Sequence, residues 1–289
     1  MLSYAVKRVI RSLGLFAALL LGVILASTFF AGVNIGADTT AKAALDQQLD
    51  RVPVDIVIGQ YGSQTSSSTV WRAAASKVAD ISGIIGTEVI SRAYWYGNTT
   101  FENNTSLRIV GVSGITNISP FYEGLTLTSG ARSLGENETY VWAGSKSVSK
   151  IQFNSTIPLN FTFSYWTGTY LWTEKSVTIS LRVVGFVELD DKSYSIAAGE
   201  FYGPIIYRPI QDKSYSTIGD NLLILNWTKT FPKLLDAIPS NVSYYSSPFG
   251  TQILAYIDRE ALVNPWDIQG SLKAVESITA QANQAVATY

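Results

Sequence analysis

The sequence predicts an α+β fold, with one N-terminal transmembrane helix extending into a stalk, followed by a mixed α/β ectodomain with a β-rich middle section. Three observations predict it. Residues 12–33 contain no charged side chain. Helical and strand-like periodicities alternate near both ends of the remaining chain. Strand-like segments dominate the stretch between those ends, and this segregation is typical of the α+β class.

The uncharged segment 12–33 predicts a membrane-spanning helix. At 1.5 Å per residue it reaches about 33 Å, against a hydrocarbon core of roughly 30 Å. Lys7, Arg8 and Arg11 precede it, and this basic flank marks the membrane boundary and places the N-terminus in the cytoplasm. The alternative is a cleaved secretory signal, but the apolar run exceeds the usual ~7–15 residues and offers no good A-x-A cleavage step.

These features divide the chain into four parts. We expect a cytoplasmic basic N-terminus at residues 1–11, a transmembrane helix at 12–34, a helical stalk at 35–51 and an extracytoplasmic α+β domain at 52–289. The last part is either one body or two subdomains, which would comprise 52–105 with 220–289, and 106–219.

The first elements follow from apolar spacing. Residues 37–49 contain good helix formers with one apolar face, so the first helix is expected to continue as far as Pro53. VPVDIVI (52–58) predicts a buried strand, residues 68–81 a helix with one apolar stripe, and 87–96 a strand that alternates between two faces.

The middle of the chain is predicted to be mostly strands. Residues 106–114 and 138–144 indicate two of them, joined by a turn-rich connection with a tight bend at Gly130. A single helical turn is expected at 147–152. Residues 154–189 predict three or four strands, broken at Pro158 and near Gly168.

The C-terminal third returns to alternating elements. Residues 201–210 contain two prolines and indicate an edge strand or loop. Strands are predicted at 220–227 and 252–258, with a short helix at 230–237 between them. A last helix is expected after Pro265, with Asp267 as its N-cap.

Composition excludes several kinds of function. Charged residues make up 15% of the chain and the formal net charge is −1, so no basic surface for nucleic acid is expected. There is no Cys and no His, which excludes disulfides, thiolate nucleophiles, imidazole bases and Cys/His metal sites. No nucleotide-binding glycine motif is present. We therefore expect no metal, no cofactor and no enzymatic activity.

One acidic group is a candidate catalytic centre. Glu188, Asp190 and Asp191 stand close together in VELDDKSYS. Adjacency in sequence does not hold two carboxyls ~5–9.5 Å apart across a cleft, as glycoside hydrolysis needs. We interpret the group as solvating the turn after a strand, and an extracellular hydrolase as the least favoured function.

Asn-x-Ser/Thr sequons are frequent after residue 97 and absent before it, as expected of an exported domain with glycans on its loops. The alternative is that they are ordinary polar turns. Asn103 and Asn104 overlap, so both are not expected to be used, and the sequon of Asn117 is followed by Pro120. The candidate glycosylation sites are Asn98, Asn103, Asn104, Asn137, Asn154, Asn160, Asn226 and Asn241.

Several short motifs resemble the first half of an FtsX-like or MacB-type ABC transporter permease. They are the basic N-terminus with one membrane helix, VPVDIVI, GLTLTSGARSL with Gly130 and Arg132, ETYVWAGSKSVSKI with STIPLN, and LRVVGFVE (181–188). The Gly-Arg bend is one residue out of step with the family pattern. The resemblance implies a non-catalytic extracytoplasmic part that couples a cytoplasmic ATPase to work outside the membrane.

The partners implied are the lipid bilayer, an ATPase subunit, and further permease segments or subunits, because that family has additional membrane helices. A homo- or hetero-oligomer would follow. The alternative function is a single-pass, N-glycosylated cell-surface protein that binds or scaffolds. Low charge, no Cys and many sequons together favour an archaeal or otherwise harsh external setting. The small number of ion-forming residues argues against a hyperthermophile surface, and the hypothesis of an acidic medium, in which carboxylates lose their charge, reconciles the two.

Overall fold

The computed structural model describes residues 2–50, 52–59, 67–113, 120–167, 171–199, 221–237, 243–246 and 249–287. The chain divides into two compact units, Met1–Arg51 and Val52–Tyr289. The finer subdivisions of both units stay predictions.

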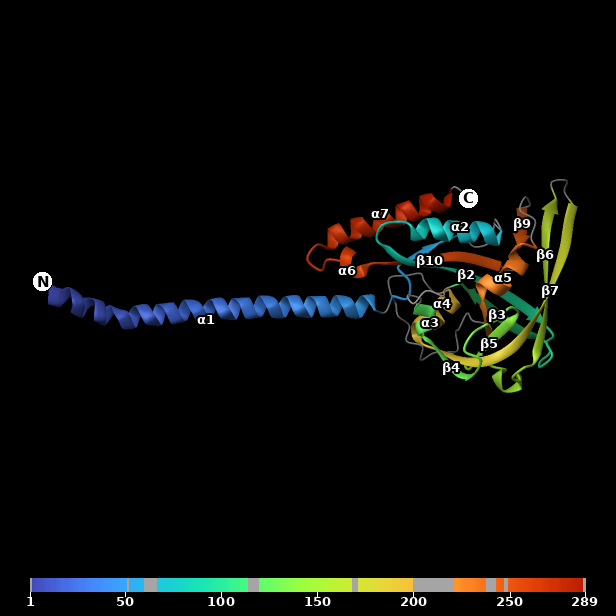
Figure 1. The fold of residues 1–289 in the computed structure, drawn as a ribbon, viewed down its shortest axis with the longest axis horizontal. Coiled ribbons are helices and arrows are strands. Elements are labelled where there is room, and N and C mark those ends of the chain that lie inside the picture. Colours follow the sequence, from blue (N-terminus) through green and yellow to red (C-terminus); the bar gives the residue numbers. More distant parts are fainter. Residues whose placement is uncertain are drawn as a thin grey trace. The chain divides into compact units, whose positions relative to one another are not determined.

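The first unit is a single helix, α1 (Leu2–Leu49), without interruption at the expected end of the membrane segment (Figure 1). Its 48 residues give it a length of about 70 Å. Side chains are described from Leu19 onward, and the large apolar ones between Leu19 and Ile35 are exposed. The hydroxyl groups of Thr28, Thr39 and Thr40 donate to carbonyls one turn earlier, so the helix satisfies its own polar groups.

The second unit is built on one ten-stranded mixed sheet in the order β1-β10-β2-β3-β8-β5-β7-β6-β9, with β4 paired to β7 beside this path. The strands are β1 (Ile56–Ile58), β2 (Ile84–Gly97), β3 (Thr105–Val112), β4 (Leu125–Gly130), β5 (Glu138–Trp142), β6 (Thr156–Thr167), β7 (Leu171–Leu189), β8 (Asn221–Asn226), β9 (Ser243–Ser246) and β10 (Phe249–Ile257). The helices are α2 (Ser68–Ala79), α3 (Pro120–Glu123), the 3₁₀ turn η1 (Val148–Lys150), α4 (Asp191–Ala198), α5 (Trp227–Leu235), α6 (Arg259–Leu262) and α7 (Ile268–Ala287).

The last strand of the chain joins its first two. β10 lies between β1 and β2 and is antiparallel to both. β3 pairs with β8 and β5 with β7 in parallel. One sheet therefore continues through both of the subdomains that the sequence suggested.

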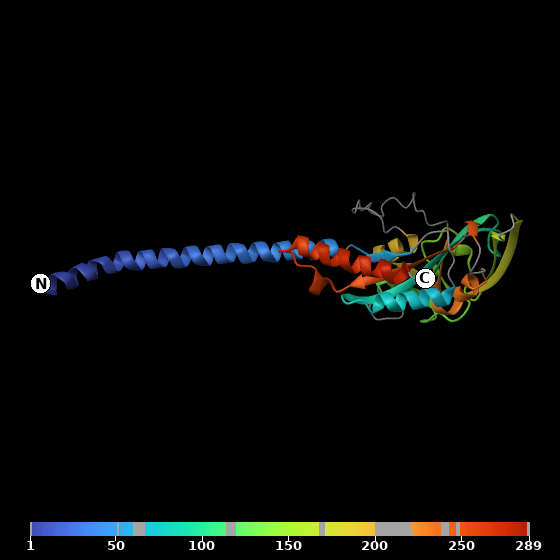
Figure 2. The same ribbon diagram turned by 90° about the horizontal axis from the view of Figure 1, so that it is seen from above.

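Each face of the sheet has its own core. On one face, α2, α5 and α7 pack through Val78, Phe231 and Ile278, and α2 and α7 lie side by side there (Figure 2). On the other face, Phe121 of α3 and Ile196 of α4 cover the sheet. Alternate residues of β2 face the two cores, as the predicted strand alternation requires.

Most predicted elements are present, with corrections in the middle of the chain. Residues 154–189 form two long strands instead of three or four, and Pro158 lies inside β6, opposite Ser180 of β7. β9 pairs only with Ser164–Trp166 on the other side of β6. On the side of β6 away from β7, no described strand lies beside Pro158. The N–H that proline lacks therefore costs no hydrogen bond to a neighbouring strand on that side.

Five elements were not predicted: α3, β4, α4, β9 and α6. The connection expected to be turn-rich contains β4, which ends at Gly130 with φ of +111°, so the bend itself is confirmed. β1 is shorter than the expected strand at 52–58. Residues 201–210, where an edge strand or loop was expected, lie outside the described residues. At α7, Asp267 Oδ1 accepts the Gly270 N–H at 2.8 Å, which confirms the predicted cap.

Candidate functional site

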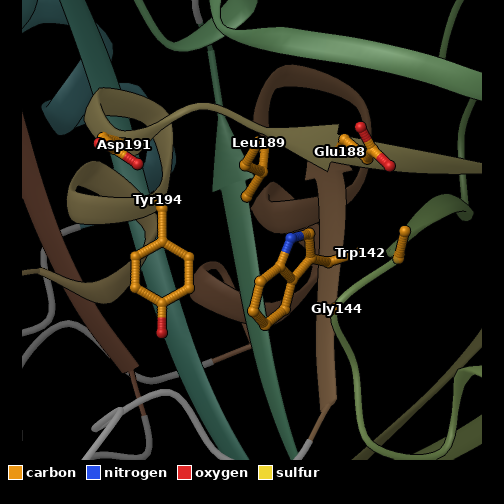
Figure 3. A pocket seen from close by; sticks show the side chains of 7 residues that line it. Trp142, Gly144, Glu188, Leu189, Asp191 and Tyr194 are labelled. Atoms are coloured by element: carbon orange, nitrogen blue, oxygen red, sulfur yellow. The ribbon is translucent and has the colours of Figure 1, made fainter. Parts of the chain in front are cut away.

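A pocket of about 380 Å³ opens where two parallel strands end side by side (Figure 3). β5 and β7 run parallel, with Trp142 opposite Val187, and the chain leaves β7 into α4. In α/β sheets, ligands bind outside the carboxyl ends of parallel strands. The lining residues are Trp142, Ala143, Gly144, Glu188, Leu189, Asp191 and Tyr194.

Two aromatic side chains form part of this pocket. Trp142 comes from the last position of β5 and Tyr194 from α4, and their ring centroids are 5.1 Å apart with planes inclined at 51°. Gly144 leaves room for the indole ring of Trp142, since a Cβ at position 144 would lie 2.3 Å from the Cζ2 atom of that ring. Both rings are half-buried, so each keeps part of its surface open to the pocket.

The acidic group of residues 188–191 has two separate roles. Glu188 and Asp191 line the pocket and are exposed. Asp190 is the N-cap of α4, where its Oδ1 accepts the Ser193 N–H at 2.8 Å. The sequence placed these carboxylates on a turn after a strand, and the structure adds that two of them face the same cavity as Trp142.

Buried arginines hold the other end of α4. The Nη2 of Arg92 donates to the Ile196 carbonyl at 2.6 Å, and the Nη1 of Arg108 donates to the Ala198 carbonyl at 2.8 Å. Arg92 also donates to Gln252 Oε1 at 2.6 Å. Positive charge at a helix C-terminus is favourable. With its N-cap and these contacts, the helix that carries Tyr194 is held at both ends.

A buried carboxylate lies on the same face of the sheet. Glu88 is 1% exposed and accepts a hydrogen bond of 2.7 Å from the Tyr256 hydroxyl. Burial, then the charge of Glu88, raises the pKa of Tyr122 to about 12. The same two causes raise the pKa of Tyr256 further. Both phenols therefore stay neutral at physiological pH, and the group is part of the core, outside the pocket lining.

The candidate glycosylation residues differ in their exposure. Asn226 is buried and caps α5, with its Oδ1 accepting the Lys229 N–H at 3.2 Å. Asn137 is half-buried. Asn117 and Asn241 lie outside the described residues. The exposed sequon residues are Asn98, Asn103, Asn104, Asn154 and Asn160.

Three of the sequon asparagines have left-handed backbones, with φ of 52° at Asn104, 56° at Asn137 and 61° at Asn154. Asparagine adopts this conformation in tight turns more readily than most residues, which is also what ordinary polar turns would show. The membrane-boundary residues Lys7, Arg8 and Arg11 lie in α1, and their side chains fall outside the described part of the chain.

In the described residues, no group of three or more acidic side chains is arranged to hold a metal ion. Among the described side chains, the helix Leu19–Leu49 is the one segment long and apolar enough to cross a membrane, and signal sequences share that property. The pocket is the candidate site that the described residues offer.

Comparisons with known proteins give a likeness in fold only. No family model matches the chain, and no curated protein matches it. Among solved structures, the periplasmic region of MacB from Actinobacillus actinomycetemcomitans is similar with a TM-score of 0.40 and 12% identity, over 81% of this chain and 86% of that one.

Proposed function

We propose that this chain is the membrane-anchored, extracytoplasmic part of an ABC-transporter permease-like protein of the FtsX or MacB type. In this proposal α1 crosses the membrane, and the unit Val52–Tyr289 works outside it without catalysing a reaction. A cytoplasmic ATPase, carried by another chain, supplies the energy. The membrane lipids, that ATPase and further permease segments are the partners.

The observation that carries the proposal is the exposed apolar surface of α1. Between Leu19 and Ile35 its large apolar side chains are mostly 49–68% exposed. Contiguous apolar surface of this extent is rare on proteins in water and marks a membrane or protein contact. The span matches the thickness of a hydrocarbon core.

The length of α1 supports a coupling role. The helix continues without a break from Leu2 to Leu49, well past the apolar segment. A rigid helix can pass a displacement from the cytoplasmic side to the other side of the membrane, whereas a flexible linker would absorb it. The motif resemblance to permeases of the FtsX and MacB type points to the same role.

A second candidate is a single-pass, N-glycosylated surface protein that binds a ligand. The aromatic and acidic pocket and the five exposed sequon asparagines favour it. It differs from the first candidate in needing neither an ATPase nor other membrane-spanning chains.

Co-purification distinguishes the two candidates. The full chain, tagged at its C-terminus, is isolated from its native membranes in mild detergent, and a chain that begins at residue 52 is the control. A stoichiometric ATPase or a multi-span partner that the control fails to retain supports the permease-like function. A homogeneous assembly of this chain alone contradicts it and favours the second candidate.

A further inference from the structure

We infer that Asn98 carries an N-linked glycan whose first sugar ring stacks on the side chain of Tyr96. The ligand class is a hexose or N-acetylhexosamine ring, and its source is the chain's own glycan. The inference rests on the proposed location of the second unit outside the membrane. It goes beyond that proposal, because it assigns one modified residue and one residue that binds the sugar.

The end of β2 directs Tyr96 and Asn98 to the same side. Alternate side chains of a strand share a face and lie about 6.6 Å apart. Gly97 is still paired with Thr105 of β3, and a Cβ on Gly97 would lie 2.9 Å from the ring of Trp95. Trp95 and Gly97 thus share one face, and Tyr96 and the residue after Gly97 project from the other. A sugar attached to Asn98 is then within reach of the Tyr96 ring.

The ring of Tyr96 is open to such a contact. This side chain is 71% exposed. Tyr94, two residues earlier, is also exposed, but the guanidinium carbon of Arg108 lies 4.4 Å from the centre of its ring and covers one side of it. A sugar ring presents apolar C–H groups on one face, and stacking these groups on an aromatic ring removes apolar surface from water. Tyr96 is therefore the better platform of the two.

The amide of Asn98 is already oriented for the modification. Its Oδ1 accepts the backbone N–H of Asn104 at 3.0 Å, which places Nδ2 on the other side of the same planar group. Glycosylation leaves Oδ1 unchanged, so the modified chain keeps this hydrogen bond. Thr100, the hydroxyl residue of the sequon, is exposed. The whole motif is thus accessible in the folded chain.

The covalent step uses a lipid-linked oligosaccharide as donor, in which C1 of the first sugar is joined to a polyprenyl phosphate or pyrophosphate. The Nδ2 atom of Asn98 forms a bond to C1, and the bond between C1 and the phosphate oxygen breaks. The phosphate leaves with the electron pair of that bond, and Nδ2 loses one proton. A glycosyltransferase, carried by another chain, catalyses this transfer.

The neighbouring sequons lack an open ring at this spacing. Asn103 also follows an aromatic residue by two positions, but that residue, Phe101, packs against the core. Asn104 has an acidic residue at the same spacing. Of the three sequons in the turn between β2 and β3, Asn98 is therefore the one with an exposed aromatic neighbour.

The test uses the full chain purified in detergent from its native membranes. Mass spectrometry of peptides reports whether Asn98 carries sugar. Denaturant unfolding followed by tryptophan fluorescence gives the unfolding equilibrium constant of the second unit. Four forms are compared: the original chain, Tyr96→Ala, Asn98→Gln and the double variant.

We expect Asn98 to carry sugar in both the original chain and Tyr96→Ala. In these glycosylated forms, loss of the ring should raise the unfolding constant about three- to tenfold, as expected for one stacked ring pair. In the Asn98→Gln background, the same loss should change the constant by less than about twofold, because no sugar contact is left to lose. The difference between the two backgrounds measures the contact between the ring and the glycan.

Asn160→Gln is the matched control. Asn160 is an exposed sequon residue, and its carbonyl accepts the Nε1–H of Trp95 at 3.1 Å. Trp95 projects from the face of β2 opposite Tyr96, so a glycan on Asn160 is not expected to contact the Tyr96 ring. The effects of Tyr96→Ala and Asn160→Gln should therefore add.

Three results would overturn the inference. The first is an Asn98 without sugar in the native chain; sugar on Asn154 or Asn160 in the same sample would show that this site fails while the extracytoplasmic location stands. The second is an equal effect of Tyr96→Ala with and without the Asn98 glycan. The third is that N-acetylglucosamine at about 10 mM binds the glycosylated chain but not its Tyr96→Ala variant in saturation-transfer NMR, which would identify a site for external sugar. The co-purification tests the ATPase partner separately.

Discussion

The carboxylate of Asp236 accepts two hydrogen bonds from Ser68, one from its backbone N–H at 2.7 Å and one from its hydroxyl at 2.8 Å. Ser68 is the first residue of α2, and Asp236 follows the last turn of α5. Ser67, at the N-cap position of α2, makes no capping hydrogen bond with its side chain. The start of α2 is thus capped from a distant part of the sequence.

This cap predicts a stability effect. Asp236→Ala should lower the free energy of unfolding by about 1–2 kcal/mol, because a helix N-terminus loses its acceptor and its favourable charge. Asp236→Asn should lose less stability than Asp236→Ala, because the amide oxygen still accepts a hydrogen bond from Ser68. Denaturant unfolding followed by tryptophan fluorescence measures it. Asp80→Ala, an exposed change at the other end of α2, is the control, and equal losses in both alanine variants would contradict the capping role.

A glycine in β3 predicts a packing effect. A Cβ at Gly111 would lie 2.1 Å from the ring of Phe231, which is fully buried in α5. Gly111→Ala should therefore cost about 1–3 kcal/mol through overpacking. In the double variant Gly111→Ala with Phe231→Leu, the smaller leucine side chain has no ring in that position and should recover part of the lost stability.

The control for this prediction lies in α1. A Cβ added at Gly22 would meet nothing within 4 Å beyond the backbone of its own helix, so Gly22→Ala should leave the unfolding of the second unit unchanged. A Gly111→Ala variant as stable as the original chain would show that α5 can move away from β3 without cost.

The ion pairs of the second unit predict its response to acid. The Gly135 N–H and the Arg182 guanidinium lower the pKa of Glu138, and Ser147 and Lys150 lower that of Glu102. A carboxyl with a lowered folded-state pKa stabilises the fold above its unfolded pKa of about 4.3, and this stabilisation is lost as the pH falls through the folded value. Stability should therefore stay level down to about pH 5 and decline below about pH 4.

Glu138→Gln tests the acid response. The variant should be less stable near pH 7 and should lose less stability between neutral and acidic pH, because it has one titrating carboxyl fewer. Unfolding curves at several pH values measure both effects. An unchanged pH dependence in Glu138→Gln would mean that other carboxyls govern acid unfolding.

The sequon asparagines predict an uneven pattern of glycans. Asn98, Asn154 and Asn160 are exposed, whereas Asn226 is 6% exposed and caps α5. If the chain is glycosylated, mass spectrometry of peptides should find sugar on exposed sites and none on Asn226. Full occupancy at Asn226 would contradict the described surroundings of that residue.

The sequence predicted the parts of the fold that local patterns determine. The long α1 follows from an unbroken apolar run and helix-forming residues, and α7 from Pro265 and the Asp267 cap. β10 was predicted as a strand, and the structure places it between β1 and β2.

The missed elements depend on distant contacts. Helix α4 has few apolar residues in DKSYSIAA, and its end is held by Arg92 and Arg108 from other strands. β4 exposes most of its residues and exists by pairing with β7. The pocket was missed for the same reason, because only the pairing of β5 with β7 brings Trp142 next to Glu188 and Tyr194.

We propose that α1 is an uncleaved membrane anchor and that the second unit lies outside the membrane. The most direct measurement combines alkaline carbonate extraction, protease treatment of intact cells and the intact mass of the chain. We predict that the chain stays in the membrane pellet, retains Met1 to residue 33, and is cut by external protease beyond residue 52. A carbonate-soluble chain that begins after residue 33 would identify a cleaved signal and contradict the anchor.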